Sequence, residues 1–117
     1  RVCKGMKRML EAGVNPNRMT ISSDGQGSLP MYSKDGEFLG MGVGQSSCLL
    51  KEVKECVFKA DIPLEIALST ITSNPAEILR LKGKGKIEEG YDADLCILDQ
   101  DLQLVEVIAR GKKVYTK

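Results

Sequence analysis

Hydrophobic residues recur at helical spacing in four stretches of the chain's first 82 residues, separated by short polar loops. One side of residues 2–12 is apolar and the other is rich in Lys and Arg, which predicts a helix that ends at Gly13. We interpret these apolar stripes as core. The other helices are predicted at residues 48–59, from Pro63 onward, and at residues 74–81.

Two of these helices carry signals for their N-termini. Ser46 or Ser47 is suited to cap the helix at residues 48–59, because a hydroxyl oxygen can accept a hydrogen bond from a free backbone N–H. The run Asn74-Pro75-Ala76-Glu77 has the pattern of a capping box.

Residues 18–22 contain β-branched side chains and no breaker, which predicts a short strand. The strand leads into Ser23-Asp24-Gly25, so we expect the Asp24 carboxylate at its C-terminal tip, facing a polar opening. In a parallel α/β barrel, catalytic residues lie at that end of the strands. Asp-Gly is also a common turn dipeptide, and a plain turn without function is the alternative.

Residues 29–45 are rich in glycine and low in periodicity, which favours a flexible loop. A turn at residues 34–37 suggests a small hairpin between residues 31–32 and 38–39. Gly40, Gly42 and Gly44 do not match the dinucleotide fingerprint, because no strand leads into them and the spacing differs.

After residue 82 the pattern changes from helices to strands. Short strands are predicted at residues 93–98, 102–109 and 112–116, the last two forming a hairpin across Arg110-Gly111. The basic residues Lys82, Lys84 and Lys86 are followed directly by two glutamates, so we interpret them as a solvated loop. The order of elements predicts an α/β body at residues 1–82 with a small β layer at residues 83–117.

Composition narrows the classes of partner. The chain has 117 residues, 42% of them hydrophobic and 28% charged, with a formal net charge of +1. The near-neutral net charge, with only 4% aromatic residues and no Trp, argues against a nucleic-acid partner. No apolar run is long enough to span a membrane. The cysteines are scattered without a C-x-x-C pair, which argues against a zinc ribbon or a redox motif.

The four cysteines, Cys3, Cys48, Cys56 and Cys96, each lie among apolar residues. This favours buried, reduced thiols in a cytoplasmic protein. The chain also opens at Arg1 without a Met, inside a predicted helix, and it contains no histidine. We therefore expect it to be a piece of a longer protein.

Two segments resemble the C-terminal part of the amidohydrolase superfamily. Asn74-Pro75-Ala76, followed by residues 85–95, is similar to that family's N-P-A helix and its G-x-I-x-x-G-x-x-A-D-L strand entry. The segment Ser22-Ser23-Asp24-Gly25-Gln26-Gly27-Ser28 resembles the last barrel strand of the isoaspartyl (β-aspartyl) dipeptidases. The resemblance covers nearly the whole chain.

The resemblance implies a fold and an activity. The fold would be the C-terminal fragment of a (β/α)8, or TIM, barrel, comprising its last strand and following helices, plus the C-terminal strands of a small β-sandwich domain. A full barrel takes about 250 residues, so this chain cannot close one. The parent protein would be a cytoplasmic, zinc-dependent dipeptidase that hydrolyses β-aspartyl dipeptides and forms a homo-oligomer.

The resemblance also implies site residues. Asp24 corresponds to the strand-eight aspartate, a metal ligand and proton shuttle of a binuclear zinc site, and Ser28 to a loop residue that binds the substrate carboxylate. The histidines and the bridging acidic group of that site would lie upstream, so we expect the fragment alone to be inactive. Alternatives are a dihydroorotase-like or hydantoinase-like amidohydrolase, or a non-catalytic truncated module kept for assembly or regulation.

Overall fold

The computed structural model describes residues 2–25, 28–43 and 47–117. The chain divides into two compact units, Arg1–Ile71 and Thr72–Lys117, and each is described by itself. Helices and strands both contribute, which confirms the mixed α/β class. The predicted limit between a barrel part and a β domain after residue 82 stays a prediction.

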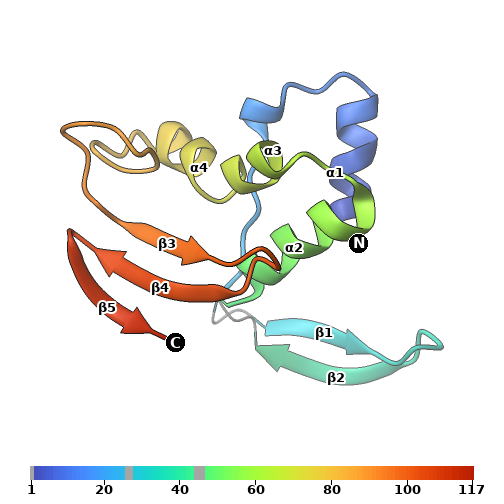
Figure 1. The fold of residues 1–117 in the computed structure, drawn as a ribbon. Coiled ribbons are helices and arrows are strands. Elements are labelled where there is room, and N and C mark those ends of the chain that lie inside the picture. The colour runs from blue at the N-terminus through green and yellow to red at the C-terminus, as the bar shows by residue number, and fades with distance from the viewer. Residues whose placement is uncertain (1, 26–27, 44–46) are drawn as a thin grey trace. The chain divides into compact units, whose positions relative to one another are not determined.

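The first unit is built around three helices, α1 (Val2–Glu11), α2 (Cys48–Ala60) and α3 (Leu64–Ser69) (Figure 1). Helix α1 packs against α2, and α2 packs against α3. These pairings bury one face of each helix, as the apolar stripes predict. The buried core comprises Cys3, Met6, Met19, Val53, Cys56, Ala60, Ile62 and Ala67.

The end of α2 shows how local chemistry sets the path of the chain. Asp61 adopts a left-handed backbone conformation with φ 54°, and its N–H donates to the Cys56 carbonyl at the C-cap. Ile62 N–H donates to the same carbonyl at 3.1 Å, and the side chain of Ile62 is buried. Pro63 then stands at the N-cap of α3, in an extended conformation that a proline ring favours. The predicted helices at residues 2–12 and 48–59 are confirmed.

The predicted strand at residues 18–22 is wrong. Pro16–Arg18 forms a short 3-10 helix, η1, which Asn15 caps by accepting a hydrogen bond from Asn17 N–H at 3.0 Å. The residues after it belong to no strand, although Ile21 N–H donates to the Thr70 carbonyl at 3.1 Å. A strand needs a neighbouring strand to complete its ladder, and the part of the chain that the structure describes offers none beside these residues.

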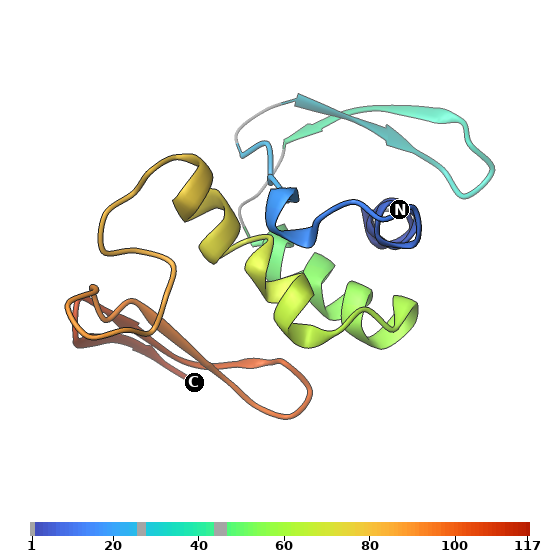
Figure 2. The same ribbon diagram turned by 90° about the horizontal axis from the view of Figure 1, so that it is seen from above.

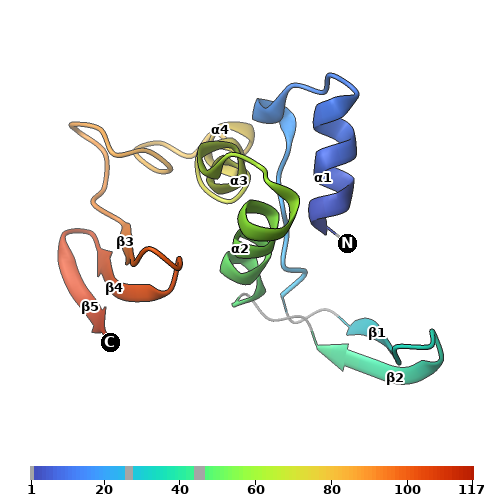
Figure 3. The ribbon, with the colours of Figure 1, turned by 45° about the vertical axis from the view of Figure 1, so that its right-hand side comes forward.

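The hairpin inside the glycine-rich segment is longer than predicted. Strands β1 (Ser28–Tyr32) and β2 (Phe38–Val43) form an antiparallel hairpin (Figure 3). Their register shifts between Met31 and Tyr32. The rings of Tyr32 and Phe38 meet edge to face with centroids 6.0 Å apart. Gly40 and Gly42 lie in β2, so the flexible-loop interpretation is wrong there, whereas Gly44 lies outside the described residues.

The second unit contains α4 (Ser73–Ile78) and a sheet of three antiparallel strands, β3 (Leu95–Leu98), β4 (Leu104–Ala109) and β5 (Lys112–Thr116). The strand order is β3-β4-β5, so β4 is central (Figure 1). Figure 2 shows the same ribbon from above. Arg110 and Gly111 connect β4 to β5 with φ values of 48° and 82°, the signature of a type I′ turn. The strand predictions after residue 82 are therefore confirmed, with shorter limits.

The predicted caps and one helix end differ from the structure. Ser47 has helical dihedral angles and makes no side-chain cap bond, and Ser46 lies outside the described residues. Helix α4 begins at Ser73, which places Asn74 inside the helix, so the capping-box prediction is wrong. The helix ends at Ile78 because Arg80 turns left-handed, with φ 55°, and Leu81 N–H donates back to the Ala76 carbonyl.

In the described part of the chain, no helix combines the length and the apolar character that a membrane crossing requires.

Candidate functional site

Asp24 is exposed and stands directly before the turn at Gly25, after residues 19–23, which belong to no helix or strand. Its backbone is left-handed, with φ 49°, and its N–H donates to the Ser22 hydroxyl oxygen at 3.2 Å. An aspartate tolerates this conformation better than most residues do, because its short polar side chain bonds locally. The predicted turn is therefore confirmed, whereas the predicted position at the tip of a strand is wrong, because no strand precedes Asp24 among residues 2–23.

Ser28 is the first residue of β1, where its backbone is registered with Val43. Its side chain lies outside the description, as do Gln26 and Gly27. The loop predicted to carry the substrate-binding hydroxyl thus connects the Asp24 bend to the hairpin. The roles of Asp24 and Ser28 stay predictions.

The donor set of the chain does not by itself fit a binuclear zinc site. Among residues 2–25, 28–43 and 47–117, no three His, Cys, Asp or Glu side chains gather to hold a metal ion. A catalytic zinc site takes about three protein ligands and a water. Asp24 could supply one carboxylate to such a site, and the described residues do not gather the other ligands around it.

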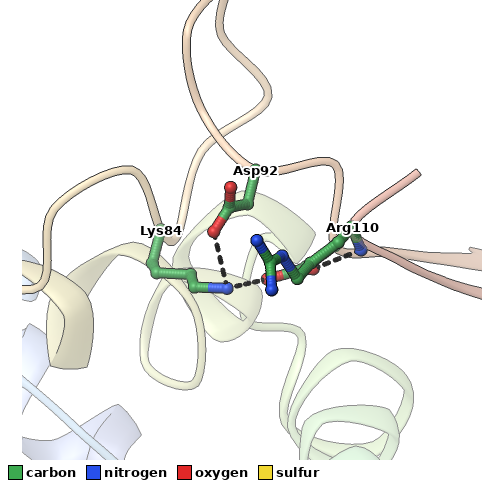
Figure 4. Close-up of polar contacts among 4 residues, drawn as sticks. Lys84, Asp92 and Arg110 are labelled. Carbon is green, nitrogen blue, oxygen red and sulfur yellow. Dashed lines mark hydrogen bonds and ion pairs between the residues drawn. The ribbon is translucent and has the colours of Figure 1, made fainter. Parts of the chain in front are cut away.

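Lys84 forms a cluster that the sequence analysis missed. Its Nζ lies 2.9 Å from Asp92 Oδ2 and 2.5 Å from Asp94 Oδ2 (Figure 4). The other oxygen of Asp94 accepts a hydrogen bond from Arg110 N–H at 2.8 Å. Asp94 therefore ties the turn of the β4–β5 hairpin to the loop after α4. Lys84 stays partly exposed, as the solvated-loop interpretation expects, but it is also held by two carboxylates that the interpretation did not include.

The cluster changes how its members titrate. The hydrogen bonds to Asp94 and then Asp92 raise the pKa of Lys84 above its usual value. The hydrogen bond from Lys84, followed by that from Arg110 N–H, lowers the pKa of Asp94. Both shifts favour the charged forms, as expected for an ion pair. The only sign of this ion-pair cluster in the sequence is the pair of aspartates two residues apart, and their spacing does not show which lysine contacts them.

Gly85 makes the closest backbone approach in this region. A Cβ atom at Gly85 would lie 2.6 Å from the Ala76 Cβ and 3.0 Å from the Thr72 carbonyl oxygen. Gly85 belongs to the G-x-I segment, and its φ of 86° is one that side chains rarely permit. This contact sets the loop against the start of α4.

A surface recess of about 460 Å³ lies where α4 runs into the loop that carries Lys84. Its lining comes from one stretch of the chain, residues 73–86, and from Tyr91. Cationic side chains outnumber carboxylates around it. The lining comprises Ser73, Ala76, Glu77, Arg80, Leu81, Lys82, Gly83, Lys84, Lys86 and Tyr91.

All four cysteines are free thiols, but they differ in exposure. Cys3 and Cys56 are buried in the helical core, Cys48 is half-buried and Cys96 on β3 is exposed. The prediction of uniformly buried thiols is therefore wrong for Cys96, because the outer strand of the sheet leaves this side chain uncovered in its unit. Burial raises the pKa of Cys56 to about 11, and the electrostatic effect of the neighbouring Cys3 is the next largest cause.

Comparison with known protein families gives a match to the Amidohydrolase family over residues 2–115. Among curated proteins, the chain is 40% identical to a dihydroorotase of Endomicrobium trichonymphae over 57 residues, which are 49% of this chain and 14% of that protein. It is 30% identical to a dihydroorotase of Thermoplasma acidophilum over 93 residues, covering 80% of this chain and 22% of that protein.

Among solved structures, a β-aspartyl dipeptidase from Fervidobacterium islandicum AW-1, in complex with the dipeptide β-Asp-Leu, is 35% identical to the chain. The alignment has a TM-score of 0.83 and covers 99% of this chain and 30% of that one. An N-acetylglucosamine-6-phosphate deacetylase from Pasteurella multocida, 18% identical with a TM-score of 0.71, shares the fold over 98% of this chain and 34% of its own. The chain thus spans less than a third of the dipeptidase's length.

Proposed function

The chain belongs to the amidohydrolase family, and from this membership we propose that it is the C-terminal part of a metal-dependent hydrolase of β-aspartyl dipeptides. In this proposal Asp24 accepts and returns a proton at the reacting centre, and Ser28 binds the carboxylate of the substrate. The proposal concerns the longer protein. The described residues of this chain do not complete a metal site.

The choice of β-aspartyl dipeptides as the substrate rests on one structural comparison. The dipeptidase from Fervidobacterium islandicum aligns with nearly the whole chain at an identity high enough to reflect more than a shared fold. The segment from Ser22 to Ser28, which resembles the last barrel strand of such dipeptidases, supports the same choice. Small polar residues around a carboxylate suit a short, charged substrate, because they offer hydrogen bonds and leave room.

The proposed role of Asp24 follows from its position and its chemistry. A carboxylate is a weak base, so it accepts a proton efficiently only when it is held against the group that gives the proton up. A bound metal ion would supply water acidic enough to lose that proton near neutral pH. The hydrogen bond between Asp24 N–H and Ser22 Oγ fixes the backbone from which the carboxylate projects.

Ser28 would act in binding. A hydroxyl group can donate one hydrogen bond to a carboxylate oxygen, in the ground state and in the transition state alike. Its place at the start of β1 gives it a backbone anchored by pairing with β2.

A second candidate is the hydrolysis of a cyclic amide, as in a dihydroorotase. The specific observation is the Thermoplasma acidophilum dihydroorotase, which matches most of this chain. Both reactions attack an amide carbonyl with water, and the residues of this chain that would take part are the same. The two candidates therefore differ in substrate, and a direct comparison of substrates separates them.

The experiment uses the longer protein that contains this chain, purified with its metal content measured. We expect β-Asp-Leu to be hydrolysed and dihydroorotate to be left unchanged. Preferential turnover of dihydroorotate would overturn the proposed substrate, and turnover of neither with metal bound would overturn the dipeptidase proposal as a whole.

Asp24→Asn tests the proton transfer. The amide keeps the size of the carboxylate and tolerates the left-handed backbone, but it cannot accept the proton. We expect kcat to fall about 10²–10⁴-fold, with metal content retained. The matched control is Asp35→Asn, at the other exposed Asp-Gly turn, which should leave kcat unchanged. Near-normal turnover by metal-loaded Asp24→Asn protein would show that Asp24 is only a turn residue.

Ser28→Ala tests the binding role. Because the proposed hydroxyl contact is present throughout the reaction, its loss should raise KM and leave kcat nearly unchanged. A fall in kcat without a change in KM would contradict this assignment.

A further inference from the structure

The recess beside α4, which we call the basic recess, is lined by the residues given above and lies wholly within the unit Thr72–Lys117. Its lining carries the cationic side chains Arg80, Lys82, Lys84 and Lys86 and a single carboxylate, Glu77. Basic and acidic residues are nearly balanced over the whole chain. Asp92 and Asp94, which do not line the recess, offset the charge of Lys84, so the excess positive charge comes from Arg80 and Lys82.

Two of the four cations are already partnered. Lys84 is held by Asp92 and Asp94, as described above, and Lys86 Nζ lies 3.9 Å from Glu77 Oε1. The side chains of Arg80 and Lys82 make no ion pair or hydrogen bond with the described residues of the chain. The recess thus presents two uncommitted positive charges, separated by a single residue, Leu81.

The backbone that carries these cations is fixed by hydrogen bonds. Arg80 N–H donates to the Glu77 carbonyl at 3.0 Å, and Leu81 N–H donates to the Ala76 carbonyl at 2.8 Å. On the far side, Asp92 N–H donates to the Gly83 carbonyl at 2.8 Å. A rim held in this way loses less conformational freedom when a ligand binds than a free loop would.

From this arrangement we propose that the basic recess binds a small phosphate-bearing anion. The guanidinium of Arg80 is suited to bind two phosphate oxygens at once, and Lys82 adds a second charge. Hydroxyl groups of Ser73 and Tyr91, which also line the recess, can donate to the remaining oxygens. The volume lies within the range of about 300–1,000 Å³ typical of small-molecule sites.

A phosphate fits the recess better than a monocarboxylate does. Two unpartnered cations match the two charges that a phosphate group carries near neutral pH, whereas a carboxylate carries one. Glu77 lies among the lining residues and would repel an anion, but Lys86 is close enough to offset it. The site is independent of Asp24, so its failure would leave the proposed function untouched.

The test is an NMR titration of the isotope-labelled longer protein that contains this chain, with inorganic phosphate and pyrophosphate, at constant ionic strength maintained with sodium chloride. We expect saturable shifts confined to residues 73–91, with pyrophosphate binding more tightly than phosphate. Acetate serves as the monocarboxylate probe and should give no saturable shifts. Saturation by acetate at the same concentration would overturn the assignment to phosphate.

The variant Arg80→Gln/Lys82→Gln removes the two uncommitted charges. Both side chains are exposed, so the fold should be unaffected. Pyrophosphate affinity should fall at least about tenfold, since charge-assisted hydrogen bonds are lost. The matched control Lys112→Gln/Lys117→Gln removes the same charge from exposed positions of the same unit and should bind normally. Equal losses in both variants, or shifts that never saturate, would show general attraction of anions and overturn the proposal.

Discussion

Replacing Gly85 with alanine should destabilise the unit Thr72–Lys117 by an amount that the structure lets us estimate. The added Cβ would lie 2.6 Å from Ala76 Cβ, 3.0 Å from the Thr72 carbonyl oxygen and 3.2 Å from Ser73 Cα. Carbon atoms in contact are normally about 3.5–4.0 Å apart. None of these neighbours is the end of a flexible side chain, so relief requires the backbone to move.

Two terms contribute to the expected loss. The left-handed backbone at Gly85, with φ 86°, costs an L-residue about 1–2 kcal/mol. Overpacking of a fixed contact typically costs about 1–3 kcal/mol more. The free energy of unfolding should therefore fall by about 2–5 kcal/mol, a large share of the stability of a domain of this size.

Gly90→Ala provides the matched control. Gly90 has nearly the same φ, 88°, but no heavy atom lies within 4 Å of a Cβ built there. Its substitution should cost only the backbone term, about 1–2 kcal/mol. The difference between the two variants isolates the contact of Gly85 with the start of α4.

The assay is a urea titration followed by NMR signals from β3 to β5, which report on the second unit alone. If Gly85→Ala leaves too little folded protein, the same change is made in an Ala76→Gly background, where the nearest atom is absent and the penalty should shrink. Equal stability losses for Gly85→Ala and Gly90→Ala would refute the close contact between the loop and α4.

Two further predictions concern titration. Asp94 should titrate below its usual pKa of 3.8, so its pairing with Lys84 stabilises the fold above that pH and is lost as the pH falls through the lowered value. A carboxyl titration by NMR checks this, and the pKa of Asp94 should rise toward 3.8 in Lys84→Met. An unshifted pKa in the wild type, or an unchanged pKa in the variant, would contradict the prediction. The Cys56 thiol, with its pKa raised from 9.0 to about 11, keeps its proton when folded, so stability should fall by about 2–3 kcal/mol as the pH rises from 9 to 11. Urea titrations across that pH range should show this loss of stability in the wild type and not in Cys56→Ala. Thiol-reactive reagents at neutral pH should modify the exposed Cys96 promptly and the buried Cys56 only when the protein unfolds.

Elements whose signals are local could be predicted from the amino-acid sequence. The apolar stripes of α1 and α2 repeat at the helical period, and the turns at residues 34–37 and at Arg110-Gly111 place the hairpins. The segment Gly85–Leu95 and the bend at Asp24-Gly25 likewise pointed to the family that the comparisons then showed. These features depend on neighbours in the sequence, which is why pattern and turn chemistry were sufficient.

Features that depend on a partner distant in the sequence could be known only from the fold. Residues 18–22 have the composition of a strand, but without a paired neighbour in the described chain they form no ladder. The sequence does not distinguish Lys84 from the two lysines beside it, but in the fold only Lys84 of the three contacts Asp92 and Asp94. Cys56 and Cys96 both lie among apolar residues, yet one is enclosed between helices and the other faces outward from a sheet. Composition sets what a side chain can do, and the packing of segments far apart in sequence decides which of those interactions it makes.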